Sequence, residues 1–298
     1  GNNVIRAEGK AKFAMMAMII PAFGNIFLDI IFIKFLNMGM FGAALATTIS
    51  YFMCFVFILW FFIKKSELKP GIHHFKFIST IVREISSLGL VTFSRQGVVS
   101  VLAIIINHTL FTYGGEHSVV IYGIISRMLM FALFPILGIT HGFLPIAGYN
   151  YGAENYNRVK ETIAISIKYS ALLATIIFLL ILIFAKPIVS VFTTDVAVIE
   201  ATPNALRWVF AATPIIALQL IGAAYFQAAG KAIPALLLTL SKQGFFLIPL
   251  VLILPNYFGI FGVWVAFPIA DILSTIITAY FLRREMTTKL IEKPDGIL

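Results

Sequence analysis

Long apolar stretches, separated by short polar segments, make up most of the chain. Each stretch reaches or exceeds the roughly 20 residues that an α-helix needs to cross a bilayer. The pattern therefore predicts eight membrane-spanning helices, at residues 13–36, 40–63, 86–112, 117–146, 161–185, 204–226, 232–254 and 259–283. Because every predicted element is a helix, the expected class is an all-α polytopic membrane protein.

Two short sequences recur along the chain at nearly the same offset. RAEGKA at 6–11 returns as QAAGKA at 227–232, an offset of 221 residues. GMFGAALA at 39–46 returns as GIFGVWVA at 259–266, an offset of 220 residues. Internal repeats of this length in an apolar chain are typical of membrane transporters.

One repeat of this length contains six of the predicted spans. Because six is an even number, both copies cross the membrane in the same direction, as in transporters with parallel repeats. We expect a twelve-helix transporter with two lobes, whose first four helices would precede residue 1. The expected division is 1–63 for the last two helices of the first six-helix lobe, 64–83 for a cytoplasmic linker, 84–285 for the whole second lobe and 286–298 for a cytoplasmic tail.

Composition agrees with this class and narrows the expected partners. The chain is 60% hydrophobic and 12% charged, with a mean hydropathy of +0.98, whereas a soluble domain is about 25% charged. A net charge of +9 could indicate a nucleic-acid partner, but most of the basic residues lie between the spans. Basic residues between spans indicate instead how the protein is oriented in the membrane. We therefore expect contact with the lipid bilayer and no nucleic-acid partner.

The basic residues alternate from one loop to the next. Lys and Arg occur in segments 1–12, 64–83, 150–160 and 283–293, whereas segments 36–40, 114–117 and 255–258 contain none. Loops rich in Lys and Arg are typically cytoplasmic. The alternation therefore predicts a multi-pass protein of the cell (plasma) membrane with both ends in the cytoplasm.

Several segments, taken in order along the chain, carry a family resemblance. They are Asn25–Ile33 with Gly39–Thr47, Pro145–Ala153, Tyr225–Lys231 and Lys242–Pro249. These resemble the fifth and sixth, the eighth, the tenth and the eleventh helices of the multidrug and toxic compound extrusion (MATE) family. The resemblance covers residues 1–285 and implies an antiporter that exports small cationic amphipathic compounds in exchange for H⁺ or Na⁺. It implies no cofactor besides that coupling ion, and a monomer when complete.

Polar residues inside the first two spans form a candidate ion-coupling site. A charge near the bilayer centre costs about 2.5–3.5 kcal/mol or more, so each one needs a reason. Asn25 and Asp29 are four residues apart and share one helix face. Asp29 lies seven residues before the end of its span and Thr47 seven after the start of the next, so all three lie at similar depth. Their carboxylate, amide and hydroxyl groups can together bind Na⁺ or hold a proton.

The repeat supports this interpretation. The positions equivalent to Asn25, Asp29 and Thr47 fall near 245–246, near 249–250 and at Phe267, all apolar. The polar residues were not duplicated although the glycines around them were, which favours a site over packing. The family resemblance implies that these three residues line the first-lobe ion site together with an Asp on the first helix. The alternative is that Asp29 pairs structurally with a neighbouring helix.

Four charged residues lie well inside the predicted second-lobe spans: Arg95, Arg127, Lys242 and Asp271. Arg127 and Asp271 lie ten and twelve residues inward from the outer ends of their spans. Equal depth and opposite charge predict a buried ion pair between them. Lys242 is expected to face the central cavity or to pair with Asp271, and Arg95 to line the cavity with Gln96. His141 is expected to be a hydrogen-bonded structural residue.

The motifs of enzymes are missing from the sequence. It contains no P-loop for ATP, no HExxH and no GxSxG, so we expect neither an enzyme nor a metal site. The adjacent His73 and His74 of the predicted linker are interpreted as solvated residues. The alternative function is a flippase for lipid-linked oligosaccharides or their precursors. Pyrophosphate would require a more cationic cavity, to which Arg95, Arg127 and Lys242 would contribute.

Overall fold

The computed structural model describes residues 1–67 and 78–290, which contain helices and no β-strand. This confirms the all-α class. Six helical segments are long and apolar enough to cross a membrane, or seven when the bent pair α6–α7 counts as one span. The chain divides into two compact units, Gly1–Val82 and Arg83–Leu298. The predicted linker 64–83 falls at this division, and its residues 68–77 lie outside the described ranges.

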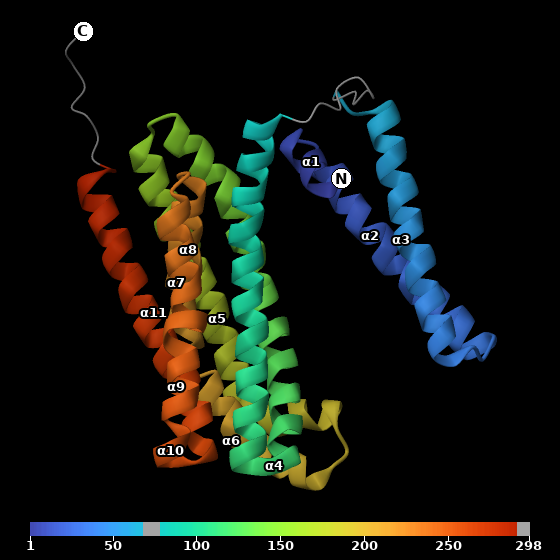
Figure 1. Ribbon diagram of the computed structural model, residues 1–298, viewed down its shortest axis with the longest axis vertical. Helices are drawn as coiled ribbons and strands as arrows, with labels where there is room; N and C mark the ends of the chain where they lie inside the picture. Colours follow the sequence, from blue (N-terminus) through green and yellow to red (C-terminus); the bar gives the residue numbers. More distant parts are fainter. Residues whose placement is uncertain (68–77, 291–298) are drawn as a thin grey trace. The chain divides into compact units, whose positions relative to one another are not determined.

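The first unit is built on a helical hairpin (Figure 1). Short α1 (Asn2–Ala7) leads into α2 (Ala11–Asp29), which continues as the π-helix η1 (Ile30–Phe35), and α3 (Gly39–Lys64) returns beside it. These elements match the first two predicted spans. Buried Ile5, Ala14 and Phe61 form a small apolar core near α1. Most other large apolar side chains of α2 and α3 are exposed, as in helices that face lipid.

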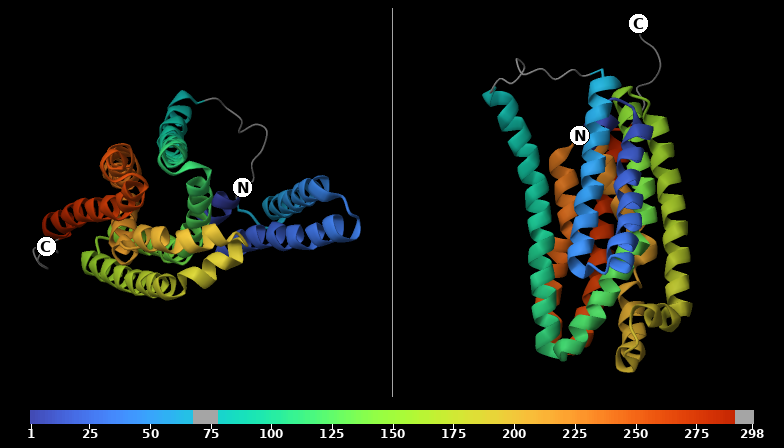
Figure 2. Two further views of the ribbon diagram at one scale, coloured as in Figure 1. Left: turned by 90° about the horizontal axis from the view of Figure 1, so that it is seen from below. Right: turned by 90° about the vertical axis from the view of Figure 1, so that its right-hand side faces the viewer.

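From α4 onward the helices belong to the second unit. They are α4 (Ser79–Gly152), α5 (Tyr156–Phe192), α6 (Val196–Val209), α7 (Thr213–Ala228), α8 (Ala232–Leu240), the π-helix η3 (Ser241–Leu247), α9 (Ile248–Ile253), α10 (Pro255–Phe258) and α11 (Ile260–Thr288). Helix α4 is interrupted at Gly115, whose φ of 67° and ψ of −168° leave the helical range. The chain doubles back there (Figure 2), so the two arms of α4 hold the predicted spans 86–112 and 117–146.

One predicted span differs in form from the structure. The segment 204–226 was predicted as one membrane-spanning helix, but α6 and α7 meet at a bend of 48°. Pro214 occupies the first turn of α7, where its missing N–H leaves the carbonyl of Phe210 without the usual helical donor. The amide of Thr213 bonds that carbonyl instead, at 2.9 Å. The bend therefore follows from proline chemistry at the start of α7.

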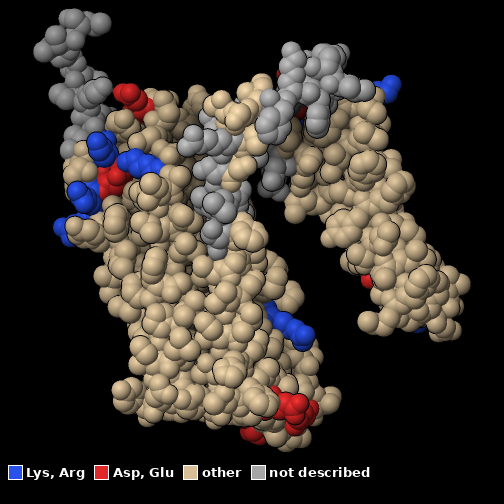
Figure 3. Space-filling view, in the orientation of Figure 1, with Lys and Arg blue, Asp and Glu red and all other residues tan. Residues whose placement is uncertain are grey.

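Two apolar clusters hold the second unit together. One joins both arms of α4 to α5, α6 and α11 and includes Ile106 and Leu206. The other joins the second arm of α4 to α5, α7 and α8 and includes Phe143 and Tyr225. On the face of this unit shown in Figure 3, the described charged side chains gather mainly toward its two ends. The broad, mostly uncharged band between them suits contact with lipid.

The two repeats share their local geometry, each within its own unit. Gly39 starts α3 with a φ of 54°, and its equivalent Gly259 precedes α11 with a φ of 58°. Three residues later, Gly42 and Gly262 each lie against the end of the preceding helix. A Cβ atom would lie 3.1 Å from the carbonyl carbon of Phe32 at Gly42 and 2.6 Å from that of Leu254 at Gly262. Each glycine pair thus allows a tight turn and a close approach of the two hairpin helices.

Candidate functional site

The three residues of the predicted ion-coupling site lie together in the first unit. The Asn25 amide on α2 and the Thr47 hydroxyl on α3 are 3.2 Å apart. In one orientation the amide nitrogen donates to Thr47 Oγ1; in the other it donates to Asp29 Oδ2, also at 3.2 Å. In the second orientation the amide oxygen also accepts from the Thr47 backbone N–H at 3.3 Å, so Asn25 bridges Asp29 and Thr47 while the Thr47 hydroxyl donates to the carbonyl oxygen of Ala43 at 2.9 Å.

Asp29 has the properties of a carboxylate held for a ligand. Its Oδ1 atom is buried and has no hydrogen-bond partner among the described residues. Asp29 is also the last residue of α2 before the π-helix η1, and π-helical segments occur frequently at functional sites. A proton or a cation would satisfy the buried oxygen.

Next to these residues is an open cavity of about 410 Å³, lined by side chains of α1, α2 and α3. Asn25 and Thr47 line it together with Met18, Ser50 and Cys54. The carbonyl oxygen of Ala17 accepts a hydrogen bond from the Cys54 thiol at 3.0 Å, which holds the hairpin helices together at this level. The site is therefore open to a cavity on the Asn25–Thr47 side.

The structure corrects the predicted pairing in the second unit. Asp271 on α11 forms its ion pair with Lys242 of η3, not with Arg127. The Asp271 side chain is only 3% exposed and that of Lys242 21%, whereas Arg127 is exposed. Equal depth placed Arg127 and Asp271 at one level, but it carried no information about which helices are neighbours. Lys242, the alternative partner, is on the helix that packs against α11.

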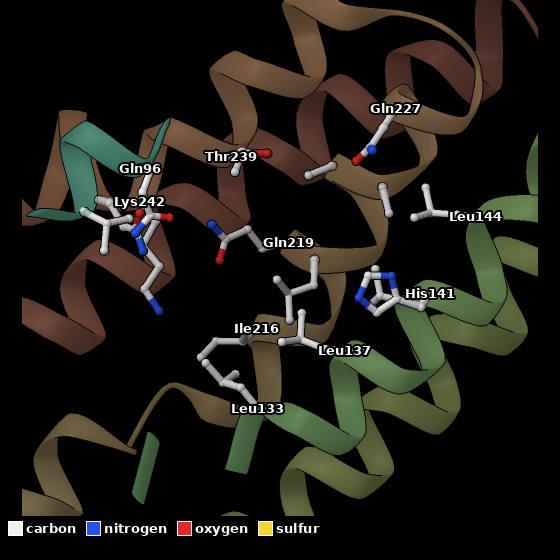
Figure 4. Close-up of a pocket in the computed structure, with 16 residues that line it drawn as sticks. Gln96, Leu133, Leu137, His141, Leu144, Ile216, Gln219, Gln227, Thr239 and Lys242 are labelled. Carbon is white, nitrogen blue, oxygen red and sulfur yellow. The ribbon is translucent and has the colours of Figure 1, made fainter. Parts of the chain in front are cut away.

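A second cavity, of about 430 Å³, lies beside Lys242 within the second unit. Figure 4 shows Lys242 and Gln96 on one side of it, His141 on the other and Gln219 between them. Gln96 was expected here, whereas Gln219 and Thr239 were not identified from the sequence. Gln219 and Thr239 could have been identified from the sequence as polar side chains within apolar spans. The side chain of Arg95 is outside the described part of the structure.

The polar clusters of the two units occupy related places in the repeat. The equivalent of Asn25 is at 245–246, and Lys242 lies three or four residues before it. The equivalent of Thr47 is Phe267, and Asp271 lies four residues after it. Because the hairpin helices are antiparallel, both shifts run in the same direction along the hairpin. Each copy thus has a polar cross-link between corresponding helices, displaced by one helical turn.

Neither cluster has the composition of a metal centre. Among the described residues, no group of three or more His, Cys, Asp and Glu side chains lies close enough to hold a metal ion. His73 and His74 fall outside those residues. The oxygen set at Asp29 instead suits a proton or an alkali cation.

Comparison with known proteins gives the family context. Multidrug export protein MepA of Staphylococcus haemolyticus (strain JCSC1435) is 28% identical over 286 residues, which cover 95% of this chain and 63% of that relative. MepA of Staphylococcus aureus (strain N315) is 27% identical over 295 residues, covering 98% and 65%. The chain thus spans just under two thirds of the length of these relatives.

Solved structures agree with these matches. An outward-facing multidrug resistance MATE family transporter of the MOP superfamily superimposes with a TM-score of 0.85 at 26% identity, covering 96% of this chain and 65% of that one. An inward-facing MATE family transporter gives 0.80 at 27% identity, covering 96% and 67%. The family model described as MatE matches residues 92–253. Since this match takes in more than half of the 298 residues, the chain belongs to the MatE family of transporters.

Proposed function

We propose that the chain acts in multidrug efflux, as a secondary active antiporter that exports small cationic amphipathic compounds in exchange for H⁺ or Na⁺. The relatives named as multidrug export proteins support the transport of drugs. The observation that supports coupling of export to an ion gradient is the Asn25–Asp29–Thr47 cluster with its unpartnered carboxylate oxygen. No cofactor beyond the coupling ion enters the proposal.

The cluster supplies a simple basis for ion exchange. A proton on Asp29 would neutralise this half-buried carboxylate, and Na⁺ would instead be held by the carboxylate with the amide and hydroxyl oxygens of Asn25 and Thr47. Either ion would be stabilised while the site is closed and released when the hairpin helices shift.

Transport by the complete protein tests this proposal. Reconstituted vesicles are loaded with a cationic dye, and efflux is measured under a pH gradient alone and then under a Na⁺ gradient alone. We expect one gradient to drive efflux and the dissipation of that gradient to stop it. Equal dye movement with and without both gradients would contradict antiport.

The proposed orientation places both chain ends in the cytoplasm of a plasma-membrane protein. Thr288, at the end of α11, and Thr194, between α5 and α6, are both exposed. Single cysteines at these positions, in a Cys54→Ala background, are treated from outside with an impermeant thiol reagent. Labelling is expected at Thr194→Cys only. Labelling at Thr288→Cys alone would reverse the orientation.

A flippase for lipid-linked precursors is the other candidate function, and the second cavity bears on it. A pyrophosphate group would require several cationic side chains. Among the described residues only Lys242 brings a Lys or Arg side chain to this cavity, which is one cation where a pyrophosphate group would require several. This single cation in the described lining supports our choice of drug efflux over a flippase.

A further inference from the structure

All four glutamines of the chain line the same cavity of the second unit: Gln96, Gln219, Gln227 and Gln243. They come from α4, α7 and η3, which are far apart in the sequence. A carboxamide inside an apolar span is costly unless it is hydrogen-bonded. Their convergence on one space therefore indicates a binding site and not a random scatter of polar residues.

Gln219 is the group in this set that most clearly lacks a partner. It is 5% exposed, and its Oε1 atom is buried without a hydrogen-bond partner among the described residues. Rotation about the last side-chain bond exchanges its oxygen and nitrogen atoms, so the amide can accept from or donate to a ligand. Buried polar groups are normally satisfied, and a molecule in the cavity would satisfy this one.

The charge at the cavity wall selects the kind of ligand. Lys242 lines the cavity, whereas its counter-ion Asp271 lies behind it and is 3% exposed. The ion pair therefore turns its positive end toward the cavity. The described lining contains no Asp, Glu, Phe, Tyr or Trp side chain. A cation would find neither a carboxylate nor a Phe, Tyr or Trp ring there, whereas an anion would find an ammonium group and several amide donors.

We propose that this cavity binds the anionic headgroup of a small amphipathic molecule, such as a carboxylate or a sulfonate. The Lys242 ammonium group and the amides of Gln219 and Gln243 donate hydrogen bonds to the headgroup. Leu133 and Leu137, on the second arm of α4, contact the apolar part. This site is separate from the Asn25–Asp29–Thr47 cluster, and binding there does not depend on the proposed export of cations.

A pair of fluorescent probes with opposite charge tests the proposal. Dansyl-6-aminohexanoate and dansylcadaverine carry the same fluorophore and linker, but end in a carboxylate and an ammonium group respectively. Each is titrated into the complete protein in lipid nanodiscs. We expect the anion to bind about tenfold more tightly than the cation. Equal affinity, or tighter binding of the cation, would overturn the proposal.

Variants locate the anion within the protein. Gln219→Leu, and the double variant Lys242→Gln with Asp271→Asn, should each weaken anion binding about tenfold. Lys242→Arg keeps the charge and should retain most of the affinity. Asn107→Leu removes an exposed amide on the first arm of α4, which also carries Gln96, but outside the cavity lining, and should change nothing. Unchanged anion binding in both weakening variants overturns the proposal.

Two further measurements keep these outcomes separable. If Gln219→Leu does not yield folded protein, Gln243→Leu is used instead, because Gln243 is only partly buried. Export of a cationic dye is measured in parallel. A protein that exports the dye but shows no preference for the anion overturns this inference alone. A protein that binds the anion but exports no dye overturns the proposed function alone.

Discussion

Lys10 and Lys231 occupy equivalent positions in the two repeats and make equivalent contacts. Each follows a glycine of positive φ and precedes a hairpin helix. Lys10 Nζ donates to the carbonyl oxygen of Lys65 at 2.7 Å, and Lys231 pairs with Glu285. Lys65 and Glu285 are 220 residues apart, which is the repeat offset. Each lysine therefore ties the start of its hairpin to the far end of the returning helix.

The Lys231–Glu285 contact should stabilise the second unit measurably. The side chains are 28% and 12% exposed, so Lys231→Met leaves a largely buried carboxylate without its cation. We expect a loss of about 1–2 kcal/mol, less than for a fully buried pair because water still reaches the lysine. The thermal midpoint in detergent is measured for Lys231→Met, Glu285→Gln and the double variant. The double variant should recover part of the loss.

Lys186 and Glu200 provide a matched control for that measurement. Their ion pair is 2.5 Å long, but the side chains are 58% and 62% exposed. Exposed pairs contribute little, so Lys186→Met should leave the thermal midpoint nearly unchanged. Equal effects at the two pairs would mean that burial is not what makes the Lys231–Glu285 contact important.

The Lys242–Asp271 pair should be more sensitive than either. Asp271 is 3% exposed, and breaking a buried pair by removing one partner typically costs about 3–5 kcal/mol. Lys242→Met alone should therefore sharply reduce the yield of monodisperse protein. Adding Asp271→Asn should restore much of it, whereas Arg127→Met should have little effect. If Arg127→Met strongly reduced the yield of monodisperse protein and adding Asp271→Asn restored it, Arg127 would be the partner of Asp271 after all.

The close approach at Gly262 gives a third test, directed at the hairpin itself. A Cβ atom there would lie 2.6 Å from the carbonyl carbon and oxygen of Leu254, which are backbone atoms and cannot rotate away. Gly262→Ala should cost roughly 1–3 kcal/mol. At Gly42 the nearest atom is the Met38 Cβ at 2.9 Å, so Gly42→Ala should cost less. Gly138→Ala meets nothing within 4 Å and should be neutral or slightly stabilising.

The sequence predicted most of the fold because its apolar runs are long enough to set the spans. It also brought Asn25, Asp29 and Thr47 together correctly. Asn25 and Asp29 are four residues apart and therefore share a helix face. The tight turn that follows makes the next helix antiparallel, so residue counting places Thr47 at the same depth. The π-helical segments η1 and η3 and the bend between α6 and α7 left no comparable periodic signal. They depend on local backbone hydrogen bonding.

The pairing of Asp271 could not be settled in this way. Depth along a span follows from residue counting, but the rotation of a helix and the identity of its neighbours follow from packing over the whole unit. The sequence therefore allowed either Arg127 or Lys242 as the ion-pair partner of Asp271. The packing of η3 against α11 decides for Lys242. Gln96 was expected to line the cavity, but Gln219 and Gln227 on α7 were missed because they are uncharged.

The role of Asp29 is the prediction on which the proposed coupling depends. Asp29→Asn keeps the size of the side chain and its hydrogen bond with Asn25, but it removes the charge that a proton or Na⁺ would neutralise. The matched control is Asp195→Asn. Asp195 is exposed and caps α6 by accepting a hydrogen bond from the Ala197 amide at 2.9 Å, so its replacement should not affect ion exchange.

In the complete protein, Asp29→Asn should bind the cationic dye roughly as before, because the adjoining cavity and the Asn25–Thr47 contact remain. Efflux driven by the ion gradient should fall by about an order of magnitude or more, since losing a buried ionic ligand typically costs a few kcal/mol. Dye binding is measured by fluorescence titration and efflux in reconstituted vesicles, with membrane amounts matched. If Asp29→Asn exports at the rate of Asp195→Asn, the coupling ion binds elsewhere. The unpartnered oxygen of Asp29 would then have only a structural role.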